Sequence, residues 1–118
     1  MFRLRNTVTP VKRQFERAVA QLPVAHQSAV TVATTHLHET AVEAALQAGR
    51  DPAALTVAGH PSAPFVGIEQ IPEGHQLANQ EYGTPKASPS PVLRTAVRNE
   101  TPTAKKIYDA HLRQGLGL

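Results

Sequence analysis

Apolar side chains recur every three or four residues in the first part of the chain, which is the spacing of one helix face. Thr9 and Pro10 suit the N-cap and the first helical position, and Pro23 favours an end or a kink. A longer stripe of small apolar residues then continues to the next glycine without another proline. The pattern predicts a helix over residues 8–22 and a long helix over residues 24–48.

The middle of the chain consists of short runs of β-forming residues between prolines and glycines. Residues 55–58 and 65–71 are predicted strands. Residues 75–82 could return antiparallel to the second strand, although a helical turn at 75–80 is the alternative, because these residues have little β preference. We therefore expect a small antiparallel sheet over residues 55–82, covered by the long helix.

Helical spacing returns after a proline-rich connector. Ser90 and Pro91 suit the N-cap and the first helical position, so a helix is predicted over residues 91–114, with a break or kink near residues 101–102. A chain of 118 residues fits one domain. The expected fold is α+β: an N-terminal helix and one long helix packed on a small antiparallel sheet, followed by a C-terminal helix.

The stretch from residue 77 to residue 96 is predicted to connect the sheet to the C-terminal helix. It is interpreted as a strand end, a tight turn, a rigid linker and a helix start. Gly83 allows a positive φ in the turn, and Pro85 prevents further ladder pairing. Glu81 could be a general acid, but we interpret it as a structural or interface carboxylate that holds the turn or pairs with an arginine of a neighbour.

Composition and charge narrow the function. The chain has five aromatic residues and no tryptophan, so alanine and valine supply most of its apolar mass. Small side chains bury little apolar area, so we expect the stability of the fold to depend partly on contacts with other subunits. Its net charge is +3, with basic clusters near both ends. These clusters could contact nucleic acid or an acidic protein, but solvated helix faces are the favoured interpretation, since no known nucleic-acid reader motif accompanies them.

Several classes of site are not expected. The absence of cysteine excludes a disulfide framework and a thiolate metal site, and no apolar run is long enough for a signal peptide or a membrane span. His36 and His38 would point about 200° apart on a helix, so they are not expected to share a metal. The other histidines show no ligand spacing, and no nucleophile elbow or phosphate loop is present. We predict no catalytic, cofactor-binding or metal-binding residues and no enzymatic activity.

A short motif resembles a known family. It consists of an acidic and an aromatic residue, Gly-Thr, a spacer, and a helix start with Pro, Leu, Arg and Ala, and it resembles the signature of the tail-completion or neck proteins of long-tailed bacteriophages. The matching residues are Glu81, Tyr82, Gly83, Thr84, Pro91, Leu93, Arg94 and Ala96. Val92 stands where that family usually has an aromatic residue, and Thr95 where it usually has a second proline.

The resemblance implies a structural virion protein of the head–tail connector, or neck. Such a tail-completion subunit assembles in the bacterial host cytoplasm, forms a ring with copies of itself around the DNA channel, and joins head and tail. Its implied partners are adjacent connector proteins and tail-tube or terminator proteins, with non-specific contact to packaged DNA and no membrane. Alternatives are a tail terminator, a head-completion (stopper) ring protein or, ranked lower, a small basic DNA-binding regulatory domain, because the break at Pro23 is too short for a helix-turn-helix.

Overall fold

Three helices and a two-stranded sheet make up the chain. The computed structural model describes residues 2–61 and 63–118, with side chains described from residue 11 onward. The elements in chain order are α1 (Phe2–Gln47), β1 (Leu55–His60), β2 (Ala63–Ile68), α2 (Pro72–Tyr82) and α3 (Val92–Leu116). This arrangement confirms the α+β class expected from the sequence.

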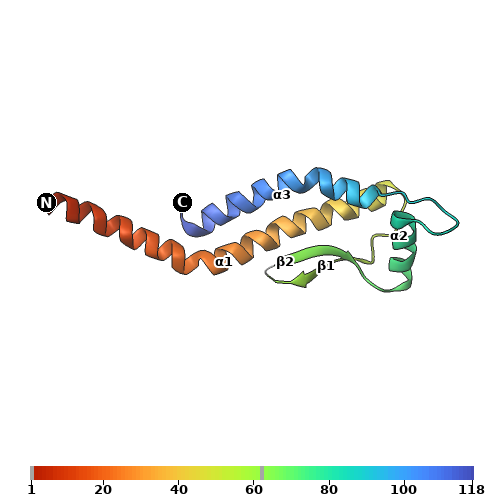
Figure 1. Cartoon of the computed structure of the whole chain (residues 1–118), viewed down its shortest axis with the longest axis horizontal. Helices are drawn as coiled ribbons and strands as arrows, with labels where there is room; N and C mark the ends of the chain where they lie inside the picture. Colours follow the sequence, from red (N-terminus) through yellow and green to blue (C-terminus); the bar gives the residue numbers. More distant parts are fainter. Residues whose placement is uncertain (1, 62) are drawn as a thin grey trace.

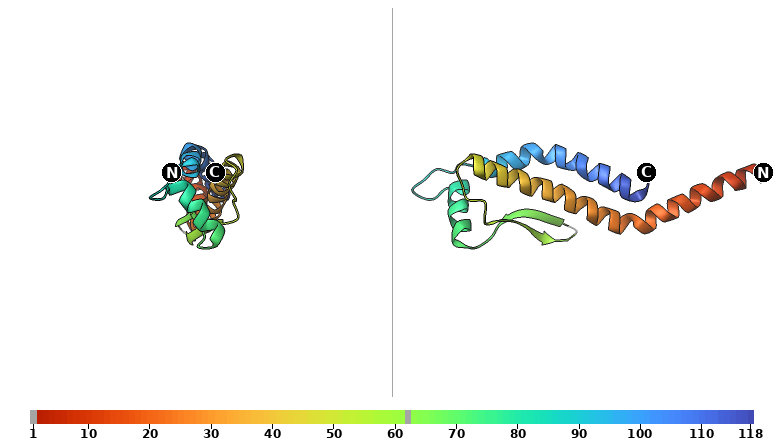
Figure 2. Two further views of the ribbon diagram at one scale, coloured as in Figure 1. Left: turned by 90° about the vertical axis from the view of Figure 1, so that its right-hand side faces the viewer. Right: turned by 180° about the vertical axis from the view of Figure 1, so that it is seen from behind.

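The molecule is long and thin, with extents of 77 × 23 × 20 Å. α3 runs antiparallel beside α1, the β hairpin packs on α1, and α2 stands across the end of the helix pair (Figures 1 and 2). The first part of α1 extends beyond the end of α3 as a single helix (Figure 1). The radius of gyration is 20.6 Å, whereas a compact domain of this length would have about 13.5 Å.

α1 is one continuous helix, so the predicted division into helices over 8–22 and 24–48 is wrong. Both Pro10 and Pro23 lie inside it. A proline removes one backbone hydrogen bond and kinks a helix, but it does not have to end the helix where helix formers lie nearby, such as the alanines and glutamines near Pro23. Figure 1 shows α1 bent in its orange stretch, near the end of α3.

Replacing Pro23 with alanine should stiffen the first part of α1. The change restores an N–H to the helix ladder and removes a ring that clashes with the preceding turn, a penalty of about 3 kcal/mol in a helix interior. Amide hydrogen exchange measured by mass spectrometry should become slower over residues 11–22. Val24→Ala is the matched control next to the proline, and it should leave exchange nearly unchanged.

β1 and β2 pair antiparallel with Leu55 opposite Ile68 and Val57 opposite Val66. The strand considered for residues 75–82 is wrong, and the helical alternative is correct, because residues 72–82 form α2. Pro72 occupies the first turn of this helix and Glu73 is an acidic residue in the same turn, both of which favour a helix start.

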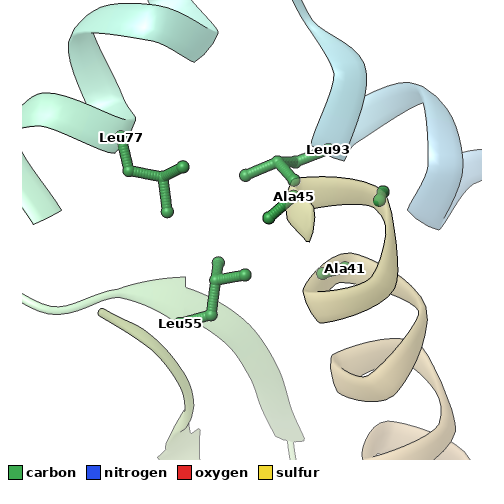
Figure 3. Packing of buried hydrophobic residues seen from close by; sticks show 6 residues of the cluster. Ala41, Ala45, Leu55, Leu77 and Leu93 are labelled. Carbon is green, nitrogen blue, oxygen red and sulfur yellow. The ribbon is translucent and has the colours of Figure 1, made fainter. Parts of the chain in front are cut away.

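The core is small and rich in alanine. It gathers Ala41 and Ala45 of α1, Leu55 of β1, Leu77 of α2 and Leu93 of α3 (Figure 3). Alanines on α1 let the other elements approach its backbone closely. This packing links all parts of the body at one end of the helix pair.

Near the other end of the pair, α3 also approaches α1 closely. A Cβ on Gly115 would lie 2.8 Å from the Cβ of Ala25. α3 also runs through Pro102 without a break, which leaves the kink as the predicted alternative near residues 101–102. Among the described residues, no helix combines the length and apolar character needed to cross a bilayer.

Candidate functional site

The most distinctive feature of the body is a buried carboxylate, Glu81, in the last turn of α2. Its residue is 1% exposed. Positions four apart share one helix face, and Leu77 of α2 is also buried. The face that carries Leu77 into the core therefore carries Glu81 towards the start of α3.

Glu81 caps α3 from another helix. The Leu93 N–H donates to Oε1 at 3.0 Å and to Oε2 at 3.1 Å, and the Arg94 N–H donates to Oε2 at 3.2 Å. Helix N-termini leave backbone N–H groups without partners and carry partial positive charge, so a carboxylate there is favourable on both counts. The prediction of Ser90 as the N-cap residue is wrong. α3 begins at Val92, so Pro91 occupies the N-cap position, and its own side chain makes no capping hydrogen bond.

Arg50, just after α1, is the counter-ion of this carboxylate. Its Nη1 lies 3.7 Å from Oε1 of Glu81, with side chains 7% and 1% exposed. Nη2 donates to the Ser90 carbonyl at 3.0 Å, so the carbonyl of Ser90, rather than its hydroxyl, takes part in the site. Among the described residues, Nη1 has no hydrogen-bond partner. The ion pair joins the end of α1 to the end of α2 and to the connector before α3.

The outer side of the site carries a second arginine. Arg94 donates from Nη2 to the Glu81 carbonyl at 3.1 Å, and its guanidinium carbon lies 4.3 Å from the centroid of the Tyr82 ring. Tyr82 is 58% exposed. Arg94 therefore ties α3 to the last turn of α2 and presents an aromatic–cation pair at the surface.

Arg94→Lys should lower the free energy of unfolding by about 1 kcal/mol. Lysine keeps the charge but loses the planar group that stacks on Tyr82 and donates to the Glu81 carbonyl. Urea unfolding followed by circular dichroism measures the difference. The same change at Arg98, an exposed position one turn further along α3, should be close to neutral. Equal effects at the two positions would contradict a specific contact at Arg94.

The connector between α2 and α3 is tied back on itself. The Gly83 N–H donates to Asn79 O at 2.9 Å and ends α2, with φ of +82° at Gly83. Thr84 and Ala87 exchange backbone hydrogen bonds at 2.9 and 3.2 Å, and the Ser90 N–H donates to Gln80 O at 3.1 Å. The turn expected at residues 82–85 thus follows a helix, not a strand.

All eight residues singled out from the sequence lie between the end of α2 and the first turns of α3. We call this segment with Arg50 the Glu81 corner. It comprises Arg50, Glu81, Tyr82, Gly83, Thr84, Pro91, Leu93, Arg94 and Ala96. Sequence reasoning missed Arg50, although one signal was available: it is the only basic residue between positions 39 and 81, in a stretch with six acidic ones.

The histidines of α1 serve as separate links between elements. His26 Nδ1 lies 2.7 Å from the Tyr108 hydroxyl, His36 Nε2 lies 2.8 Å from Glu100 Oε2, and His38 Nε2 lies 2.9 Å from the Leu55 carbonyl. His36 and His38 thus contact different elements, α3 and β1. In residues 2–61 and 63–118, no three His, Asp or Glu side chains are grouped to hold a metal ion.

Comparison of the chain with protein-family models, with curated proteins and with solved structures finds no match. The function is therefore argued from the chain's own residues.

Proposed function

We propose that this chain is a structural subunit of the head–tail connector of a tailed phage, a ring-forming tail-completion protein. The observation that carries the proposal is the Glu81 corner. The residues that resemble the neck-protein signature come together in one arrangement, built on the buried Glu81 and Leu93, that fixes α3 relative to α2 and α1. An arrangement that fixes the shape of the chain fits a building block of an assembly.

The chemistry of the corner favours this structural role over catalysis. The Glu81 carboxylate accepts two backbone N–H groups, faces Arg50, and is shielded from solvent. A general acid or base needs a substrate proton within reach, and a carboxylate enclosed in this way offers no such approach. In the proposed role, Glu81 holds the subunit in the shape that its neighbours recognise.

The arrangement of helices disfavours the lower-ranked alternative, a small DNA-binding regulatory domain. A helix-turn-helix joins two helices by a turn of three or four residues and leaves the second free to enter the major groove. Here residues 83–91 separate α2 from α3, and α3 packs along α1. These features favour an assembly subunit over a sequence reader.

In vitro complementation tests the proposal. Extracts of bacteria infected with a phage that carries a nonsense codon in this gene should accumulate filled heads and separate tails. Adding the purified wild-type protein should restore plaque-forming particles. Particles that form normally without the protein would overturn the proposal. Cross-linking mass spectrometry of the restored particles would place the subunit beside portal-side or tail-side proteins, which separates tail completion from the stopper and terminator alternatives.

A further inference from the structure

The first part of α1 carries an apolar stripe that lies open to solvent. We call residues 11–24 of α1 the arm, and we call Val11, Phe15, Ala18 and Leu22 its seam, because their spacing alternates between four and three residues. This alternation is typical of the line along which two helices pack as a coiled coil. Val11, Phe15 and Leu22 are 62%, 69% and 46% exposed. The seam therefore has the pattern of a helix–helix interface, but no described helix lies on it.

The same spacing continues into an interface within the chain. It leads from Leu22 to Ala25 and Ala29, both of which are buried. A Cβ on Gly115 of α3 would lie 2.8 Å from the Cβ of Ala25, so this face of α1 receives α3. α3 ends at Leu116, and the arm extends past that end as a single helix (Figure 1). The seam is thus the uncovered part of the face on which α3 packs.

Most charged side chains of the arm lie away from the seam. Arg13 and Arg17 are about 160° and 200° around the helix from Phe15, so they project from the opposite side of α1. Lys12 flanks the seam, and its long side chain can extend into solvent. The other flank carries two uncharged residues, Gln14 and Gln21. Two arms could therefore meet along their seams with most of their like charges on the outside.

We infer that the arms of two copies of this chain pack together antiparallel, seam against seam. Phe15 of one copy lies beside Val11 of the other, and the two-fold axis passes near residue 13. A Phe and a Val at each of the two central layers bury apolar side chains that are exposed in the single chain.

The position of α3 selects both the orientation and the occupant. In a parallel pair, α1 of the second copy would continue past Ala25 into the place that α3 occupies. In an antiparallel pair, α1 of the second copy begins where α3 ends and leaves the arm at its free end. A helix of another protein would have to begin at this same point, whereas the arm of a second copy already has the required length.

The contact is isologous, so it closes at two copies and adds no third. It does not rest on the proposed neck function. In the free protein it covers the apolar seam, and in a ring, whose subunits all point the same way, the two arms would have to separate. The arm is therefore the part of the chain that the pair and the ring use differently.

Sedimentation velocity of the purified full chain tests the contact. The wild type should show a concentration-dependent monomer–dimer equilibrium and no larger species. Phe15→Ser and Leu22→Ser should each weaken the dimer by at least about tenfold, because each removes apolar contacts from both halves of a two-fold interface. Val24→Ser is the matched control, since Val24 is 75% exposed on the same arm but lies on the side opposite the seam.

A distance measurement tests the orientation. The chain has no cysteine, so Ser28→Cys, at an exposed position, provides a single site for a spin label. With the axis near residue 13, antiparallel arms place the two labels about thirty residues apart along the pair, or about 45 Å. Parallel arms would place them side by side, within about 20 Å. Double electron–electron resonance distinguishes the two distances.

Three results would overturn the inference. The first is a wild type that stays monomeric at about 0.5 mM, where even a Kd of ~1 mM is detectable; the seam would then belong to a helix of another protein. The second is a dimer that Val24→Ser weakens as much as Phe15→Ser does. The third is a label distance within about 20 Å. If the antiparallel dimer forms but the protein fails to restore phage particles, the dimer stands and the neck function is wrong.

Discussion

Glu81→Gln is expected to lower the free energy of unfolding by about 3–5 kcal/mol. The amide keeps the volume of the side chain but removes the charge that faces Arg50 and the strongest acceptor for the Leu93 and Arg94 N–H groups. Arg50 would then be a buried cation without a counter-ion. Urea denaturation followed by circular dichroism at neutral pH measures the loss.

The matched control is Glu43→Gln, an exposed glutamate on α1, which should change stability by less than about 0.5 kcal/mol. A second variant isolates the ion pair. Arg50→Met together with Glu81→Gln should cost less than the sum of the two single changes, because the double change leaves no unpaired charge. A Glu81→Gln protein as stable as the control would contradict the structural role assigned to this carboxylate.

Gly83→Ala is expected to cost about 3 kcal/mol. The backbone at Gly83 has φ of +82° and ψ of 175°, a region that is essentially restricted to glycine and costs other residues about 1–3 kcal/mol. Space is also lacking, because a Cβ there would lie 2.7 Å from Pro89 N and 2.9 Å from Ala87 O. Both neighbours are backbone atoms of the tied-back connector, so they cannot move aside independently.

Gly49→Ala separates these two effects. Gly49 also has a positive φ, +70°, but a Cβ there would meet no atom within 4 Å. Only the backbone penalty remains, which is about 1–2 kcal/mol. Thermal and urea unfolding of both variants should therefore rank Gly83→Ala well below Gly49→Ala. Equal losses of stability in the two variants would show that the connector backbone does not clash with a Cβ at position 83.

Much of the fold follows from local signals. The change from helical spacing to β-forming runs near residue 50, and back after residue 90, predicts the long helix, the hairpin and α3. The wrong predictions concern residues whose type is compatible with more than one local structure. Pro23 and Pro102 suggest helix ends but lie within helices, because packing along the α1–α3 pair outweighs one lost hydrogen bond at each proline. Residues 75–82 are weak strand formers, and burial of Leu77 and Glu81 on one face accounts for their helix.

The site was predictable in part. The residues at positions 81–84 and 91–96 were identified from their pattern, and they lie together because only the short connector separates them. The capping of α3 was not predicted correctly. Ser90 is a favourable cap by type, but a carboxylate from another helix occupies that role, and such a contact depends on tertiary packing rather than on local preference. Arg50 lies 31 positions before Glu81, so no helical or turn spacing connects the two.

The slender outline of the molecule affects how it moves in solution. A rod experiences more friction than a sphere of equal mass, so one 12.7 kDa chain should diffuse slowly and leave a gel-filtration column ahead of globular standards. It would resemble a larger particle even when no second chain is attached. Tumbling about the long axis should also be faster than end-over-end rotation, so that NMR relaxation rates will depend on the direction in which each N–H bond points.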